Sequence, residues 1–240
     1  MRPPLGQAMA ILAAACPEMA TAELAALSVG ERDARLLALR EGTFGPRLDG
    51  LAECPRCREP LEFTLHTPDL LARPPDETEG TGRADGNEGA VAGEHTLAVE
   101  GYDVRFRLLT SQDLAAAAAG ADVESARSLL VQRCVLGAWK DGRAISPLAL
   151  PETVVERLAA RLAECDPQAE VVLDLTCPAC NHQWPAIFDV AAFFWTELSA
   201  QARRLLRQVH TLALAYGWSE TDILAMSGRR RHAYLELVGA

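Results

Sequence analysis

Two Cys-Pro-x-Cys motifs constrain this chain more than any other feature of its sequence. They are Cys54-Pro-Arg-Cys57 and Cys177-Pro-Ala-Cys180, with proline at the same position in each. Two thiolates at this spacing in a tight turn suit two corners of a tetrahedral zinc site. The repeated motif therefore predicts a zinc ribbon with one structural zinc ion, whose four ligands are Cys54, Cys57, Cys177 and Cys180.

The separation of the motifs is unusual for such a site. Residues 58–176, a stretch of 119 residues, lie between them, whereas about 15–20 residues separate the two pairs in the usual spacing. We therefore predict a split zinc ribbon with a helical unit inserted. Much of the 49% apolar content is alanine and aromatic residues make up only 5%, so the expected fold class is α+β, predominantly helical, with a long C-terminal helix.

Other chemistry is open to the same cysteines. Separate metal sites would need further ligands: His182 could serve the second motif, whereas His66 is distant from the first. Either pair could also be a redox C-x-x-C, although neither has the βαβ setting of a thioredoxin site. The remaining cysteines lie on predicted helices and are expected to be buried small apolar residues; they are Cys16, Cys134 and Cys165.

Composition and periodicity divide the chain into six regions. Between 72 and 95 the sequence is acidic, Gly-rich and without periodicity, which is typical of a flexible linker. The predicted regions are an N-terminal helical region (1–43), the first ribbon half (44–71), the linker (72–95), a hairpin plus helical insert (96–169), the second ribbon half (170–188), and a long helix with a helical tip (189–240).

Local signals give the expected elements. Ser28 caps a helix that Gly42 ends, and Thr110 caps another helix. Alternating apolar residues predict strands that flank the cysteine motifs and a hairpin before Thr110. The expected strands are 61–65, 96–99, 102–106, 170–176 and 184–188, and the expected helices include 5–16, 123–137, 151–165, 190–216, 219–226 and 228–238.

The longest predicted helix begins after the N-cap Asp189 and stops at Gly217. Its apolar residues recur at steps of four and three, which predicts either the spine of the domain core or a docking face for a partner helix. The candidate partner-binding residues are Trp195, Leu198, Leu205, Val209, Leu212 and Tyr216, with Trp218 beyond the helix.

Charge and cysteine usage restrict the environment and the partners. A net charge of −10 excludes an overall basic coat for nucleic acid, although two short helices after a long one could form a helix-turn-helix with arginines 203, 204, 207 and 229–231. The sequence contains no run of about 18 apolar residues, so no membrane span is predicted. The odd number of cysteines argues against a secreted disulfide framework, so we expect a cytoplasmic protein; the alternative of a lipoprotein signal ending at Cys16 is weak because its apolar run is short.

No catalytic constellation is readable in the sequence. There is no Gly-rich phosphate loop, no Ser-His-Asp grouping and no His-Glu-x-x-His motif, and the five histidines are scattered. We therefore expect a protein that is not an enzyme and has no small-molecule substrate.

Several motifs in the last third of the chain resemble a known family. They are the second Cys-Pro-x-Cys after a strand, Phe188-Asp-Val, Phe193-Phe-Trp, Arg204-Leu-Leu-x-x-Val-His210 and Ala215-Tyr-Gly-Trp-Ser219. The chain resembles bacterial proteins labelled baseplate hub assembly chaperones of T-even-type phage tails, which accompany phage tail-like contractile injection systems. The resemblance is strongest over 170–238. It implies an assembly or accessory role with a baseplate or hub protein as partner.

Overall fold

A computed structural model describes residues 4–71, 93–120 and 122–239. The chain divides into two compact units, residues 1–192 and residues 193–240. Helix predominates in both units, which confirms the expected predominantly helical α+β class. None of the helices in the described ranges is long and apolar enough to cross a membrane.

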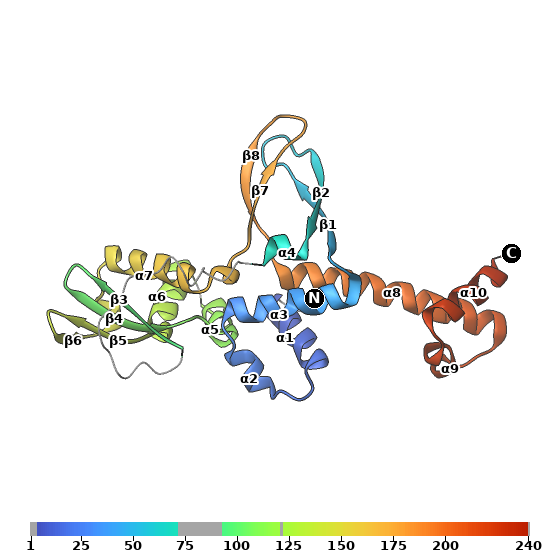
Figure 1. Cartoon of the computed structure of the whole chain (residues 1–240), viewed down its shortest axis with the longest axis horizontal. Coiled ribbons are helices and arrows are strands. Elements are labelled where there is room, and N and C mark those ends of the chain that lie inside the picture. Colours follow the sequence, from blue (N-terminus) through green and yellow to red (C-terminus); the bar gives the residue numbers. More distant parts are fainter. Residues whose placement is uncertain (1–3, 72–92, 121, 240) are drawn as a thin grey trace. The chain divides into compact units, whose positions relative to one another are not determined.

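The first unit contains all the strands of the described residues, and one helix, α8, runs from the end of this unit into the second (Figure 1). The helices are α1 (Pro4–Ala15), α2 (Thr21–Ala26), α3 (Val29–Phe44), α4 (Thr67–Leu70), α5 (Ser111–Ala118), α6 (Val123–Cys134), α7 (Glu152–Cys165), α8 (Val190–Tyr216), α9 (Glu220–Ala225) and α10 (Gly228–Val238), with short 3-10 turns at Pro147–Ala149 (η1) and Pro167–Ala169 (η2). The strands are β1 (Arg47–Glu53), β2 (Pro60–His66), β3 (Glu94–Val99), β4 (Tyr102–Arg107), β5 (Val135–Lys140), β6 (Arg143–Ile145), β7 (Val172–Thr176) and β8 (Gln183–Ile187).

Helices α1, α2, α3 and α5 pack together in the first unit. Ser28 caps α3 as predicted, since its hydroxyl accepts a hydrogen bond from the Glu31 N–H at 3.1 Å. The predicted stop at Gly42 is wrong, because α3 continues to Phe44. The helix ends instead at Gly45, which has a positive φ of 87° that favours glycine, and whose N–H donates to the Glu41 carbonyl.

The insert between the two cysteine motifs contains a four-stranded antiparallel sheet in the order β3-β4-β5-β6. The predicted hairpin is confirmed as β3 and β4, joined at Glu100 and Gly101. The predicted helix 123–137 is wrong in its last turn: α6 ends at Cys134 and the chain continues directly as β5. The predicted linker 72–95 lies outside the described residues except for its last three, and β3 begins at Glu94.

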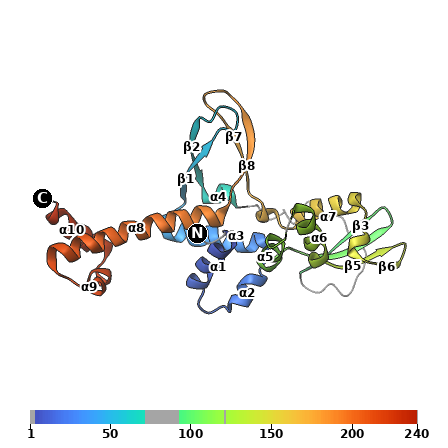
Figure 2. The same ribbon diagram turned by 180° about the vertical axis from the view of Figure 1, so that it is seen from behind.

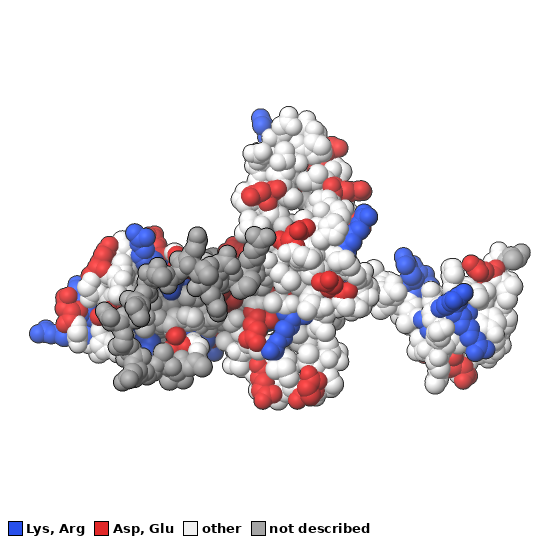
Figure 3. Space-filling view, viewed as in Figure 1, with Lys and Arg blue, Asp and Glu red and all other residues white. Residues whose placement is uncertain are grey.

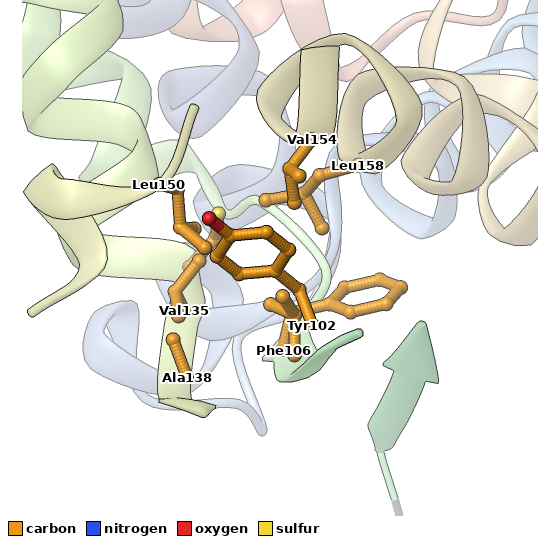
Figure 4. Close-up of a cluster of buried hydrophobic side chains, with 9 residues drawn as sticks. Tyr102, Phe106, Val135, Ala138, Leu150, Val154 and Leu158 are labelled. Atoms are coloured by element: carbon orange, nitrogen blue, oxygen red, sulfur yellow. The ribbon is translucent and has the colours of Figure 1, made fainter. Parts of the chain in front are cut away.

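A compact apolar core joins this sheet to α7. Figure 4 shows Tyr102 and Phe106 of β4 lying close to Val154 and Leu158 of α7. Phe106 and Val154 are fully buried. The insert therefore has its own core, built from side chains of both the sheet and the helix.

A buried carboxylate fixes the start of α5. Asp113 has no exposed side-chain surface and accepts hydrogen bonds from Arg107 at 2.6 and 3.0 Å and from Arg133 at 2.6 Å. Thr110 and Asp113 also form the predicted capping pair, each side chain accepting from the other's backbone N–H. Burial raises the pKa of Asp113, but these hydrogen bonds outweigh burial and hold the pKa well below its ordinary value.

The second unit is a small helical domain with its own core. Val209 and Leu212 of α8 and Ile223 of α9 are buried together, and Trp218 and Tyr234 pack against them. The predicted end of the long helix is confirmed, because Gly217 has a φ of 67° and its N–H donates to the Ala213 carbonyl.

Candidate metal centre

Each cysteine motif lies in the turn of a two-stranded antiparallel hairpin. Cys54 and Cys57 lie in the turn between β1 and β2, and Cys177 and Cys180 lie in the turn between β7 and β8. The two hairpins run side by side and their turns meet, as Figures 1 and 2 show from opposite sides. β2, β7 and β8 agree with strands expected from the sequence, whereas β1, which leads into the first motif, was not expected.

The two turns have the same backbone geometry. In each, the N–H of the first cysteine donates to the carbonyl five residues later, and its carbonyl accepts from the N–H four residues later. The residue after the second cysteine has a positive φ. The matched pairs are Cys54 N–H to Glu59 (3.0 Å) and Cys177 N–H to His182 (2.9 Å), Arg58 N–H to Cys54 and Asn181 N–H to Cys177 (both 2.9 Å), and φ of 63° at Arg58 and 53° at Asn181.

The strand register extends the match beyond the turns. Glu53 pairs with Pro60, and Thr176 pairs with Gln183. Adding 123 to each residue number of the first pair gives the second pair. The same shift relates every paired position from 172 to 187 to a pair in the first hairpin. The two hairpins are therefore a structural repeat, which presents two matched cysteine pairs to each other.

The four sulfur atoms form one cluster with zinc-like spacing. All four Sγ atoms lie within 4.8 Å of one another, with Cys54 Sγ to Cys180 Sγ at 3.7 Å and Cys57 Sγ to Cys177 Sγ at 3.5 Å. A tetrahedral zinc ion with bonds of about 2.3 Å to sulfur requires sulfur atoms about 3.8 Å apart. All four cysteines are free thiols, and their arrangement is compatible with a metal ion at the centre.

Burial within the cluster follows the repeat. Cys54 and Cys177, the first cysteine of each motif, are fully buried, whereas Cys57 is exposed and Cys180 is half-buried. Each close sulfur pair joins one buried cysteine to one more exposed cysteine from the other hairpin. The cluster therefore lies at the surface with one side shielded by the paired turns.

The pKa values of the first motif are split. Burial raises the pKa of Cys54, but hydrogen bonds from the N–H groups of Cys57 and Arg56 and from neighbouring thiols outweigh it and lower the pKa to about 7. The N–H of Glu59 lowers the pKa of Cys57, but its contacts with Cys180 and the other thiols raise it to about 12. A cation at the centre of the cluster would offset the repulsion between neighbouring thiolates.

The alternative ligands lie outside the cluster. His66 ends β2, at the opposite end of the hairpin from the turn, and its Nδ1 lies 3.8 Å from Asp69. The His182 ring stacks on Trp184 at 5.9 Å between centroids. Within the described ranges, the metal-binding group formed by the cysteine motifs contains the four predicted cysteines alone. Each motif lies in a hairpin turn, which is not the βαβ setting of a thioredoxin-type redox pair.

The three other cysteines are apart from the cluster. Cys134 ends α6 and is buried in the insert core, where burial raises its pKa to about 11. Cys165 ends α7 and is half-buried, and burial again raises its pKa. Cys16 follows α1 and is half-buried. The expectation of burial is therefore met fully by Cys134 and in part by the other two.

The predicted partner-binding residues of α8 differ in their accessibility. Val209 and Leu212 are buried in the core of the second unit, and Tyr216 is 38% exposed. Tyr216 and Trp218 stack at 4.5 Å between ring centroids. The remaining candidates, Trp195, Leu198 and Leu205, are half-buried, as is Trp218. Partner binding by these residues stays a prediction.

The predicted arginine cluster lies on the second unit. Figure 3 shows basic side chains gathered on this unit, whereas acidic side chains predominate over the two hairpins of the first unit. Arg229 and Arg230 are exposed at the start of α10, and Arg230 lies over the Tyr234 ring at 5.8 Å. Leu214 is 75% exposed although it lies within α8, and this exposure was not predicted. Its position opposite Leu212 on a helical wheel is the signal that could have indicated it.

Comparison with known proteins places the chain in a family. The family described as T4 bacteriophage base plate protein has a model that matches residues 5–195. This match includes both hairpins and overlaps the region of strongest sequence resemblance, 170–238, only in its first part. Searches of curated proteins and of solved structures gave no match. Because the family model covers most of the chain, this protein belongs to the T4 bacteriophage base plate protein family.

Proposed function

We propose that this protein is a non-enzymatic assembly chaperone or accessory hub component of a baseplate, in a phage tail-like contractile machine assembled in the cytoplasm. The observation that carries the proposal is the family match over residues 5–195, which contains the first unit almost completely. The partner that this match favours is another baseplate or hub protein.

We propose further that Cys54, Cys57, Cys177 and Cys180 bind one zinc ion and that the paired hairpins act as a split zinc ribbon. The sulfur spacing supports this, because it is close to that of a tetrahedral zinc site. Four thiolate ligands leave no open coordination position for a substrate. The metal would therefore stabilise the fold and take no part in catalysis.

The structural value of such a metal follows from the topology. β1–β2 and β7–β8 are separate two-stranded sheets, and an isolated two-stranded hairpin is only marginally stable in water. A metal shared by both turns would join the two hairpins across the insert of 119 residues. It would thereby fix the relative position of two segments that are distant in the sequence.

The test is recovery of tail proteins at native expression. An affinity-tagged chain, produced from its own promoter in a host that assembles the tail-like particle, should co-purify with at least one baseplate component. A chaperone should be present in the lysate complex and absent from finished particles, whereas an accessory component should be present in both. Recovery of no tail component would contradict the proposal.

A second candidate function has one specific observation in its favour. Residues 193–240 contain six arginines against four acidic residues, a net charge of +2, in a chain with a net charge of −10. A zinc-ribbon regulator could use these arginines to bind nucleic acid. Binding to random duplex DNA that weakens steeply between 50 and 200 mM salt, on the order of a thousandfold for six phosphate contacts, would favour this function.

A further inference from the structure

One face of α8 in the second unit is exposed and carries both leucines and cations. Leu206 is 59% exposed and Leu214 is 75% exposed. At 100° per residue, these leucines share a helix face with three exposed basic residues. We name this face the α8 stripe, and its residues are Arg203, Leu206, Arg207, His210 and Leu214.

The unit does not need the α8 stripe for its own core. Val209 and Leu212 lie on the opposite face of α8, and there they pack with Ile223 of α9. The exposed leucines are therefore additional apolar surface on a helix whose inward face is already covered. The steps between Arg203, Arg207, His210 and Leu214 are 4, 3 and 4, so the stripe runs straight along the helix.

The charge of the stripe is not balanced along α8. The residues three and four positions from Arg203 and Arg207 include no Asp or Glu, so no carboxylate of the same helix face neutralises them. The unit as a whole has a net charge of +2, and the remaining residues 1–192 have a net charge of −12, which is −10 minus +2. The stripe therefore places two cations that α8 does not neutralise beside the exposed leucines.

We propose that the α8 stripe binds an acidic amphipathic helix of a baseplate protein, an inference that rests on the proposed function and names the chemistry of its partner. The leucines would contact apolar residues of that helix, and the arginines would pair with its carboxylates. From residue 203 to residue 214 the stripe is about 17 Å long. This length matches a partner helix of about three turns.

The exposed leucines favour a protein helix over nucleic acid as the occupant. Two leucines lie between and beside the basic residues, and a phosphate backbone offers no apolar surface to cover them. The stripe also lies beyond residue 195, where the family match ends. Its role is therefore additional to what the family match itself supports.

Charge reversal tests the proposal on the full-length chain. The variant Arg203→Glu/Arg207→Glu should recover at least tenfold less of the tail protein that co-purifies with the wild-type chain. The matched control is Arg157→Glu/Arg161→Glu, which reverses two arginines at the same spacing on the surface of α7, and it should recover a wild-type amount within twofold. Circular dichroism should show that both variants are folded, because all four arginines are exposed.

Photo-crosslinking identifies the occupant. A crosslinking amino acid at position 206 or 214 should join the chain to a peptide that is acidic and has apolar residues at helical spacing. The same group at Ala215, which is exposed on a different face of α8, should not. Crosslinks to nucleic acid or to a basic segment, or full recovery of the tail protein by the charge-reversed variant, would overturn the proposal.

A synthetic probe separates failure of this inference from failure of the proposed function. A 14-residue helical peptide with glutamates beside leucines at spacings of three and four should bind the wild-type chain at least tenfold more tightly than the Arg203→Glu/Arg207→Glu variant. If the peptide binds in this way but no tail protein is recovered, the proposed function fails and the surface stands. If tail protein is recovered and neither charge reversal nor the peptide shows an effect, the inference alone fails.

Discussion

Replacement of one buried cysteine of the cluster should lower the unfolding free energy of the first unit. The size of this loss follows from the length of the loop that the proposed metal closes. Cys177→Ser removes a fully buried thiol of the cluster, so the proposed zinc ion would no longer join the two hairpins firmly. Joining residues 57 and 177 closes a loop of 119 residues. The chain-entropy relation for crosslinks assigns about 5 kcal/mol at 25 °C to a loop of this length.

This magnitude can be measured in two ways. A loss of about 5 kcal/mol corresponds to a fall in Tm of roughly 10–20 °C for a domain of this size. Thermal unfolding of the zinc-loaded wild-type chain should therefore occur well above that of Cys177→Ser. Removal of zinc from the wild-type chain with a chelator should lower its Tm by a similar amount.

The matched control is Cys165→Ser. Cys165 is half-buried and lies outside the cluster, so its replacement tests the loss of a thiol without the loss of a ligand. We expect a change of about 1 kcal/mol or less for this variant. The reasoning would be refuted if Cys177→Ser stayed within about 1 kcal/mol of wild type, or if Cys165→Ser had the larger effect.

Three further outcomes follow from the structure. Asp113→Asn should lower the unfolding free energy at pH 7 by about 2–3 kcal/mol, since it removes the charge that two arginines share. The folded pKa of Asp113 lies below its ordinary value, so the wild type should retain this contribution above about pH 4 and lose it as the pH falls further. The difference between the urea midpoints of the wild type and the variant should therefore be smaller at pH 3 than at pH 7. Gly30→Ala should cost about 1–3 kcal/mol in denaturant unfolding, because the new Cβ would clash with Asp166 Oδ1. Gly42→Ala should instead stabilise by about 0.5–1 kcal/mol, since Gly42 is helical and has nothing within 4 Å of the added Cβ; a loss of stability there would contradict the observed extent of α3.

The sequence was sufficient to predict the cysteine cluster because the motif itself encodes the local geometry. A proline after the first cysteine and a spacing of three residues recur in both turns, and each turn brings its two thiols together. The sequence could not show that the two hairpins match along their strands. Leu61 and Trp184 occupy equivalent positions in the register, and their side chains have little in common.

The missed elements are those whose local signals are weak or conflicting. β1 contains Gly50 and charged residues, so it has little strand character apart from its partner β2. β5 follows α6 without a turn residue between Cys134 and Val135, so the apolar run is consistent with a continuing helix. Its strand form is set by pairing with β4, which is a tertiary effect that periodicity does not contain.

The ends of helices also depend on tertiary packing that local sequence signals do not contain. Gly217 was correctly predicted as a stop because the positive φ there coincides with the end of the apolar pattern. Gly42 has no such requirement and remains inside α3, whereas Gly45 three residues later takes the positive φ. A glycine predicts a helix end only where the chain must turn, and the position of the turn depends on the packing that follows it.

The most direct test of the account is the metal content and coordination of the full-length protein purified without added metal. Elemental analysis should give one zinc ion per chain, and X-ray absorption at the zinc edge should give four sulfur ligands at about 2.3 Å. Double replacement of Cys57 and Cys177, one ligand from each hairpin, should abolish the zinc. Two zinc ions per chain, a coordination shell with nitrogen or oxygen ligands, or a metal-free protein with all four thiols reduced would contradict a single site shared by the two hairpins.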